Sequence, residues 1–204
     1  MKKALDTFSH AFVINLESDH ERMGVLTPRL QAVGIEFERF QALQFEGSGK
    51  REAQRGDAFS HLEVVREARR RKLESVLIME DDVVFRPDFL KLWAIILPQL
   101  QTLDYDIFYG YDWHSASTSA ADLRITPIAG TFCSHFWAIH SCFYDTFIEA
   151  VELNDQKEAP LPVDTLFRSR KDRVYAPTYN LVGQDAGTSL ITKKFKPLRW
   201  SAWD

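Results

Sequence analysis

The chain has 204 residues, of which 45% are hydrophobic, and its formal net charge at pH 7 is −4. A chain of this length and apolar content can bury one sizeable core, so we expect a single domain over residues 1–204. The slight acidic excess argues against a nucleic-acid-binding protein that depends on a broad basic surface. The only cysteines, Cys133 and Cys142, have a spacing that indicates neither a zinc site nor a disulfide framework.

No apolar stretch of the sequence is long enough for a membrane-spanning helix. The run from Phe89 to Leu97 is interrupted by Lys91, whereas a span needs about 20 predominantly apolar residues. The first residues lack the apolar centre of a secretory signal peptide. We therefore expect a cytoplasmic protein, with the inner face of the membrane as a place where it can lie peripherally.

The first part of the chain predicts strands that alternate with helices. The apolar run His10–Leu16 is typical of a buried strand, and a helix follows whose apolar positions include Val25 and whose end is expected at Gly34. Residues 35–40 alternate apolar with charged side chains, which predicts a strand with one exposed face. Residues 43–54 contain glycine, serine and mixed charges, and we interpret them as a loop.

A second helix is expected from Ser60 to about Lys72. Ser60 and Glu63 fit a capping box, in which the hydroxyl accepts a hydrogen bond from the Glu63 amide and the Glu63 carboxylate reaches back. The four basic residues 69–72 fall in the last turn, where positive charge suits the helix dipole. A solvated helix end is the simplest explanation of this run, and contact with anionic lipid or substrate is the alternative.

The segment Ser75–Phe85 is an apolar run that is interrupted by three consecutive carboxylates. Ser75–Met79 predicts a strand buried on both faces, as in a parallel sheet. The carboxylates Glu80, Asp81 and Asp82 repel one another, and any burial adds a desolvation cost. A divalent cation such as Mn²⁺ or Mg²⁺ would compensate these charges, since hard cations prefer oxygen ligands.

The remainder of the chain predicts further helices and strands. Helices are expected at Phe89–Leu100 and Tyr144–Leu153, a helical turn at Pro162–Phe167, and strands at Tyr105–Gly110, Ile125–Ile128, Thr131–His140 and Val174–Ala176. The strands at Ile125–Ile128 and Thr131–His140 are expected to pair with each other. Strands that alternate with helices, followed by a more antiparallel second half, predict an α/β domain of the doubly wound type.

The three carboxylates follow a strand, which is where doubly wound sheets bind ligands. Adjacent residues of a strand point to opposite faces, so Glu80 and Asp82 are expected on one side and Asp81 on the other, unless a turn begins there. Acidic strand ends also occur in phosphatases, kinases and Mg²⁺-dependent nucleases, and some only cap the next helix. The pattern by itself therefore leaves several functions open.

Four segments in order narrow this choice: Val13–Leu16 with Arg22, Gly34–Ile35, Gly56–His61 and Leu77–Val83. The series resembles glycosyltransferase family 25, the lipooligosaccharide and procollagen galactosyltransferase group. Its third segment resembles a Gly-Cys-x-x-Ser-His motif, but Asp57 stands where cysteine is usual. Later segments show a thinner likeness to the same family, and these are Phe136–Ile139, Pro162–Asp164 and Gln184–Ser189.

The resemblance implies a GT-A fold, a Rossmann-like mixed sheet flanked by helices. It implies inverting transfer of a sugar, commonly galactose, from a UDP-sugar to a glycan or hydroxylysine acceptor, with Mn²⁺ or Mg²⁺ at the donor diphosphate. For this chain we expect a glycan, lipid-linked or lipopolysaccharide-type acceptor. On this basis we assign a nucleotide-binding half to about residues 8–112 and an acceptor-side half to about residues 113–204.

The same resemblance suggests roles for residues at the donor side. Asp82 and Glu80 are expected to bind the cation, and Asp81 or Glu80 to contact the ribose or a metal-bound water. Asn15 is a candidate for a hydrogen bond to uracil, and Arg22 is a candidate for a bidentate contact with the diphosphate. Both could instead be structural.

His61 and two aspartates complete the candidate residues. His61 is assigned to the donor site, with a role in the helix cap as the alternative. Inverting transfer needs a general base for the acceptor hydroxyl, for which Asp164 is the first candidate and Asp112 the second. The alternative for Asp164 is a helix cap after proline.

Two other classes of function remain open. A catalytically silent nucleotide-sugar or glycan-binding module with the same fold is compatible with Asp57 and with a chain that is short for the family. A Mg²⁺-dependent nucleotidyltransferase or other phosphoryl enzyme could also use an acidic strand end. The sequence contains no glycine-rich phosphate loop to support this last class.

Overall fold

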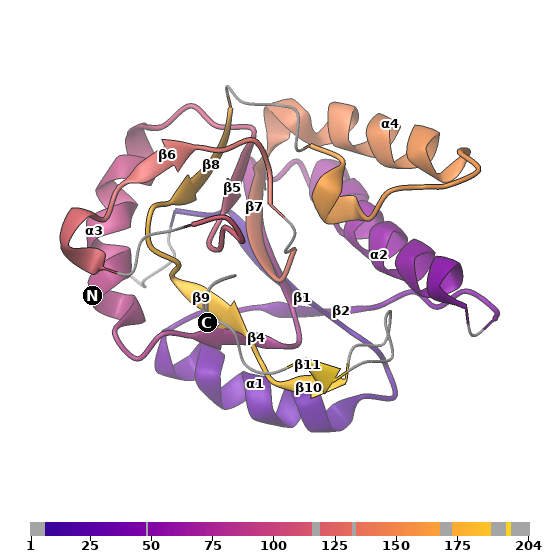
Figure 1. The fold of residues 1–204 in the computed structure, drawn as a ribbon, viewed down its shortest axis with the longest axis horizontal. Helices are drawn as coiled ribbons and strands as arrows, with labels where there is room; N and C mark the ends of the chain where they lie inside the picture. The colour runs from indigo at the N-terminus through magenta and orange to yellow at the C-terminus, as the bar shows by residue number, and fades with distance from the viewer. Residues whose placement is uncertain are drawn as a thin grey trace.

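The computed structural model describes residues 7–47, 49–115, 119–131, 134–167, 173–188 and 195–196. These residues share one seven-stranded mixed sheet and form a single α/β domain (Figure 1). The strands of the sheet are β1 (His10–Asn15), β2 (Glu38–Gln41), β3 (Ser75–Glu80), β5 (Ile107–Tyr109), β6 (Ile125–Pro127), β7 (Phe136–His140) and β8 (Val174–Pro177). The expected fold class is therefore confirmed, whereas the division into a nucleotide half and an acceptor half stays a prediction.

The strand order is β2-β1-β3-β7-β5-β8-β6. Strands β1, β2, β3, β5 and β8 run parallel, and β7 and β6 run antiparallel to them. The chain passes from β1 to β2 on one side and then to β3 on the other side of β1. The strand order thus reverses between β1 and β3, and the carboxyl ends of these two strands form the switch point of the sheet.

Within the described ranges, the two faces of the sheet are covered by the helices α1 (His20–Ala32), α2 (Lys50–Arg70), α3 (Phe89–Thr102) and α4 (Tyr144–Asp155). Apolar side chains of α1 and α3 share one core with Leu77 and Met79 of β3. Those of α2 and α4 share the opposite core with Val76 and Ile78. All four β3 residues are fully buried, so the strand is apolar on both faces, as predicted.

Helix α1 ends as the sequence predicts. Gly34 has a φ of +72°, and the amide of Ile35 donates to the carbonyl of Leu30. This left-handed turn is the usual termination that glycine permits. Val25 was expected on the apolar face of the helix but is 47% exposed, because the buried face is formed by Met23, Leu26 and Leu30.

Helix α2 begins ten residues before the predicted start. Gly49 has an extended backbone and precedes Lys50, the first helical residue, so the predicted loop at 43–54 ends early. Ser60 lies in the middle of the helix, and its hydroxyl donates to the carbonyl of Gly56 (2.6 Å) and accepts from the amide of Leu43 (2.8 Å). The predicted capping box is therefore wrong.

The second half of the sheet differs from the predicted pairing. Strand β7 pairs with β3 and β5, while β6 pairs with β8. The reason is burial: Phe136–Ile139 is buried throughout and suits the sheet centre, whereas β6 is partly exposed and suits an edge. Strand β2 begins at Glu38, three residues after the predicted start, and α3 ends at Thr102, two residues after the predicted end.

Two short ribbons were not predicted. Strand β4 (Val83–Phe85) pairs antiparallel with β9 (Val182–Gln184), and β10 (Gly187–Thr188) pairs with β11 (Phe195–Lys196). Since β4 directly follows the acidic run, this pairing brings residues 184–187 beside it. A distant part of the chain thereby joins the switch point.

The three arginines of the basic run at the end of α2 are ion-paired. Arg69 contacts Asp145, Arg70 contacts Glu67, and Arg71 contacts both Glu67 and Glu38. These contacts favour the solvated helix end over an anion-binding patch. None of the helices described here combines the length and apolarity that crossing a membrane requires.

We predict that Gly110→Ala destabilises the domain by about 1–3 kcal/mol, because there is no room for even a methyl group at this position. A Cβ at Gly110 would lie 2.3 Å from a ring carbon of Phe136, and that ring is fully buried. Urea unfolding measures the effect. Gly24→Ala is the matched control, because Gly24 lies in α1 with open space around the new methyl. This substitution should stabilise the domain by about 0.5–1 kcal/mol. Equal effects at the two sites would contradict the packing argument.

Candidate functional site

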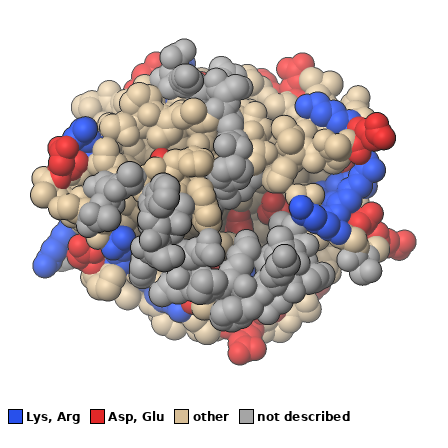
Figure 2. Space-filling view, in the orientation of Figure 1, with Lys and Arg blue, Asp and Glu red and all other residues tan. Residues whose placement is uncertain are grey.

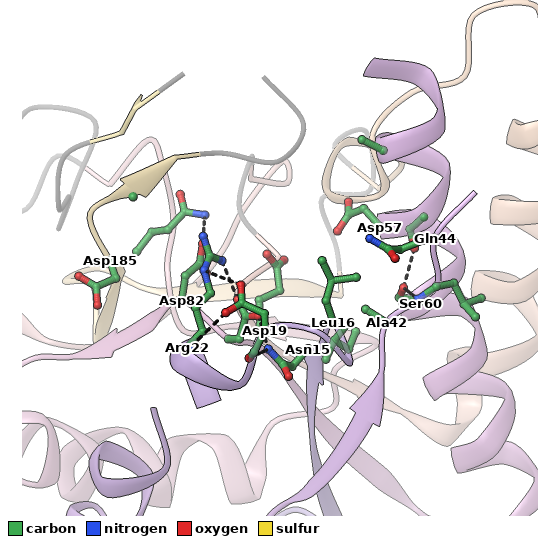
Figure 3. Close-up of a pocket in the computed structure, with 18 of the residues that line it drawn as sticks. Asn15, Leu16, Asp19, Arg22, Ala42, Gln44, Asp57, Ser60, Asp82 and Asp185 are labelled. Carbon is green, nitrogen blue, oxygen red and sulfur yellow. Dashed lines mark hydrogen bonds and ion pairs between the residues drawn. The ribbon is translucent and has the colours of Figure 1, made fainter. Parts of the chain in front are cut away.

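A cavity of about 720 Å³ lies at the switch point, a size typical of small-ligand sites. Its walls come from the ends of β1 and β3, the start of α1, the segment 42–49, the first half of α2 and residues 184–187. Figure 2 shows acidic atoms inside a recess on this face, and Figure 3 shows Asp185 and Asp57 at opposite sides of the pocket.

Carboxylates are the most numerous charged groups in the described cavity wall. Among the described residues that line it, eight are acidic, and they are Asp19, Glu21, Glu52, Asp57, Glu80, Asp81, Asp82 and Asp185. The one basic lining residue in this part of the chain is Arg22. Its guanidinium already contacts Asp81 and Asp19. The described wall of the pocket therefore carries an excess of negative charge.

The three consecutive carboxylates point toward three different elements. Strand β3 ends at Glu80, and Asp81 and Asp82 form the turn before β4. Alternation along a strand therefore does not apply to Asp81 and Asp82, because a turn begins there, which is the exception that the sequence left open. The three carboxylates still repel one another, since the charges of Glu80 and Asp81 raise the pKa of Asp82.

Asp81 is held by the residues at the end of β1 and the start of α1. Its carboxylate accepts from Asn15 Nδ2 at 2.6 Å and from Arg22 Nη1 at 2.8 Å. Burial raises the pKa of Asp81, while these two donors act in the opposite direction. Both predicted donor-side residues, Asn15 and Arg22, thus lie in the pocket and organise Asp81.

Asp82 faces the β9 side of the pocket. Gln184 Nε2 donates to its Oδ2 at 2.9 Å, and the backbone amide of Asp185 donates to its carbonyl at 2.7 Å. Its Oδ1 is buried and has no hydrogen-bond partner within the described ranges. Burial, together with the charges of Glu80 and Asp81, raises the pKa of Asp82 to about 7.

This unpaired oxygen fits a bound cation. A buried carboxylate oxygen without a donor is costly, and hard divalent cations take oxygen ligands. The amide oxygen of Asn15 is likewise buried without a partner in the same part of the chain. The switch point therefore offers several oxygen atoms as possible metal ligands. Among the described residues of the pocket wall, carboxylates outnumber basic side chains.

Glu80 turns toward α2. Ser134 Oγ donates to Glu80 Oε1 at 2.5 Å, and His61 Nε2 lies 3.4 Å from the same oxygen. Burial would raise the pKa of Glu80, but the hydrogen bonds from His61 and Ser134 outweigh it and lower that pKa to about 2. Glu80 lines the cavity, whereas His61 is fully buried behind it.

The two predicted general bases are not among the described residues that line this cavity. The carboxylate of Asp112 accepts from the amide of His114 at 3.0 Å, and the backbone of Asp112 is bound by Asn180. Asp164 belongs to the short helical turn η3 (Val163–Thr165), and its side chain lies outside the described part of the structure. Both assignments stay predictions.

Some pocket residues have no strong signal in the sequence. Asp185 belongs to the tail that lacks periodicity, and it forms an ion pair with Arg29 at 2.6 Å. Gly56, by contrast, begins one of the segments singled out in the sequence, and the structure explains why it is glycine: a Cβ there would lie 2.6 Å from the carbonyl oxygen of Leu43. Gln184 begins a sequence segment with a thin family likeness, whose last residue, Ser189, is outside the described residues.

Comparison with known proteins identifies a fold and no family. No model of a protein family matches the chain, and no curated protein matches it. The crystal structure of A197 from STIV aligns with a TM-score of 0.50 and 15% identity over 91% of each chain. That likeness shows that the α/β arrangement recurs, and at this identity it assigns no activity.

Two further solved structures align less well. A glycosyltransferase involved in the glycosylation of the major capsid of PBCV-1 gives a TM-score of 0.49 at 11% identity, over 82% of this chain and 80% of that chain. Mannose-1-phosphate geranyltransferase from Thermus thermophilus gives 0.39 at 11% identity, over 82% and 72%. The likeness to family 25 therefore stays a prediction from sequence motifs.

We predict that Asp82→Asn stabilises the metal-free protein at pH 8 by about 1–2 kcal/mol, allowing for partial exposure of the side chain. The folded protein holds the pKa of Asp82 near 7, above the value of 3.8 for a free carboxyl. The native carboxylate therefore costs stability as the pH rises from about 4 to about 7. Thermal unfolding in chelator at several pH values measures the gain.

The gain from Asp82→Asn should disappear near pH 4, where the folded protein holds both side chains neutral. Asp145→Asn is the control, because its side chain is 86% exposed on α4, and it should change little at either pH. A gain that does not depend on pH would contradict the electrostatic origin.

Proposed function

We propose that this protein is a metal-dependent inverting glycosyltransferase that uses a UDP-sugar, with galactose as the first candidate, and a glycan or lipopolysaccharide-type acceptor. The observation that carries the proposal is the oxygen-rich group at the switch point, with the unpaired Asp82 oxygen at the end of the β3–β4 turn, as far as the chain is described. Ligands of doubly wound sheets bind at this place. The ordered likeness to family 25 supports the choice of chemistry.

The charge of the pocket supports a requirement for a cation. A nucleoside diphosphate is an anion, and the pocket wall described above carries eight carboxylates and a single, already paired guanidinium. A divalent ion, Mn²⁺ or Mg²⁺, would offset the repulsion by joining the diphosphate to the carboxylates. When bound, such an ion would neutralise the charge of the departing nucleoside diphosphate.

Asp82 and Glu80 are the residues we assign to the cation. Asn15 and Arg22 fix the carboxylate of Asp81, which leaves Asp81 available to orient a ribose hydroxyl or a water. Arg22 can reach a diphosphate while it keeps contact with this carboxylate, since guanidinium has five donors. The general base remains Asp164, with Asp112 as the second candidate. Asp164 lies in the proposed acceptor-side half, about residues 113–204, and Asp112 lies at the border of that half.

A catalytically silent nucleotide-sugar or glycan-binding module is the second candidate function. The position of Asp112 favours it, because this predicted base is absent from the described cavity lining and its backbone is bound by Asn180. Such a module would bind the donor and the cation but release no UDP. A cytoplasmic location, with peripheral attachment to the inner membrane face, belongs to either proposal.

The experiment is a thermal-shift screen of UDP-, GDP- and CMP-sugars with Mn²⁺ or with chelator, followed by measurement of UDP release. A ligand present at about 100 times its Kd stabilises the native state by about 2.7 kcal/mol. We expect stabilisation by UDP-sugars only with Mn²⁺, and UDP release that falls about 100-fold or more in Asp82→Asn, because the cation stabilises the departing charge.

Asp145→Asn, an exposed substitution outside the pocket wall, should leave UDP release unchanged. Stabilisation without UDP release would favour the silent module. No stabilisation by any nucleotide sugar in the presence of Mn²⁺ would contradict both functions.

A further inference from the structure

A buried imidazole connects the centre of the sheet to the floor of the acidic pocket. Trp137 Nε1 of β7 donates to His61 Nδ1 at 3.3 Å. On the other side of the ring, His61 Nε2 lies 3.4 Å from Glu80 Oε1 and 3.7 Å from Asp57 Oδ1. His61 is fully buried and Trp137 is 2% exposed, so solvent does not compete for these contacts.

The contact with Trp137 determines which ring nitrogen carries the proton. An indole N–H can only donate, so Nδ1 of His61 must offer its lone pair. In a neutral imidazole the proton then resides on Nε2. The sheet therefore directs the N–H of His61 at the carboxylates of Glu80 and Asp57.

This tautomer conflicts with metal binding through His61. Asp57, His61 and Glu80 offer ligand atoms that lie within 4.8 Å of one another, a grouping that by itself suggests a metal centre. A protonated Nε2 has no lone pair for a metal, however, and Nδ1 is engaged with Trp137. The group is better described as one donor between two acceptors.

Both contacts of Glu80 fall on the same oxygen. Ser134 Oγ also donates to Oε1, at 2.5 Å, and a short O–H to carboxylate bond of this kind is charge-assisted. One oxygen of Glu80 is thus held by a hydrogen bond from Ser134, while Nε2 of His61 lies close to the same oxygen without an aligned hydrogen bond. Glu80 also lines the cavity, so a ligand there would meet a carboxylate that is already oriented.

We propose that His61 is a positioning residue and not a metal ligand. Its Nε2–H faces the carboxylates of Glu80 and Asp57 at 3.4 and 3.7 Å and attracts both, so that, together with the hydrogen bond from Ser134, it orients Glu80 toward the cation. The role toward the cation rests on the proposed function, whereas the tautomer does not. Groups that orient a metal ligand typically change metal affinity by about 10–100-fold.

The first test is nuclear magnetic resonance of the uniformly ¹⁵N-labelled full chain in chelator. Two-bond correlations of the His61 ring should show a neutral imidazole that is protonated at Nε2. Trp137→Phe keeps an aromatic ring but removes the indole donor, and it should shift the ring toward the other tautomer or toward imidazolium. A wild-type ring that is protonated at Nδ1 would overturn the proposal.

The second test is the affinity for Mn²⁺ alone, measured by electron paramagnetic resonance. His61→Leu should weaken binding about 10-fold or more, whereas His61→Gln, which retains an N–H donor, should stay within about 3-fold of wild type. Equal losses in the two variants would indicate that His61 is itself a ligand. Wild-type affinity in His61→Leu would show that it does not position Glu80.

Ser134→Ala is a second test that does not depend on whether variants at the buried His61 fold. It removes the second donor to Glu80 Oε1 from a partly buried position and should also weaken Mn²⁺ binding. Unchanged affinity in Ser134→Ala would count against the role of that oxygen. If the wild type binds no Mn²⁺, the proposed function fails, and the resonance experiment still decides the tautomer.

Discussion

Repulsion among three consecutive carboxylates is the constraint around which the switch point is built. Glu80, Asp81 and Asp82 follow a strand that is buried on both faces, so the chain cannot move them into solvent together. The turn after Glu80 gives each carboxylate different partners. Glu80 contacts His61 and Ser134. Asp81 contacts Asn15 and Arg22, and Asp82 contacts Gln184. Each partner belongs to a segment remote in sequence, which ties the pocket to the whole fold.

The compensation is incomplete, and the remaining imbalance carries the functional argument. Asp82 keeps a buried oxygen without a partner among the described residues, and its pKa is raised to about 7 by burial and by its neighbours. Buried polar atoms without a partner are uncommon in folded proteins, and raised carboxylate pKa values are frequent at functional sites. Glu80 in the same pocket differs sharply, since its pKa is lowered to about 2 because donors outweigh its burial.

The layered fold makes this difference possible. Glu80 continues the β3 face that packs on α2, where His61 stands with its second nitrogen engaged by Trp137. Asp82 lies beyond the strand and meets β9, which reaches the site only because β4 pairs with it. Neighbours in sequence thus enter environments of different hydrogen-bonding capacity, and environment determines the protonation of a carboxylate.

Local sequence alone specifies the alternation of strands and helices at the start of the chain, the burial of β3 and the acidic group at its end. These features depend on periodicity and on charge at adjacent positions, which a single sequence displays directly. Tertiary contacts instead establish that Ser60 lies inside α2, that β7 separates β3 from β5, and that Gln184 reaches Asp82. Those outcomes depend on contacts between distant segments, where packing overrides local propensity, and no local pattern encodes them.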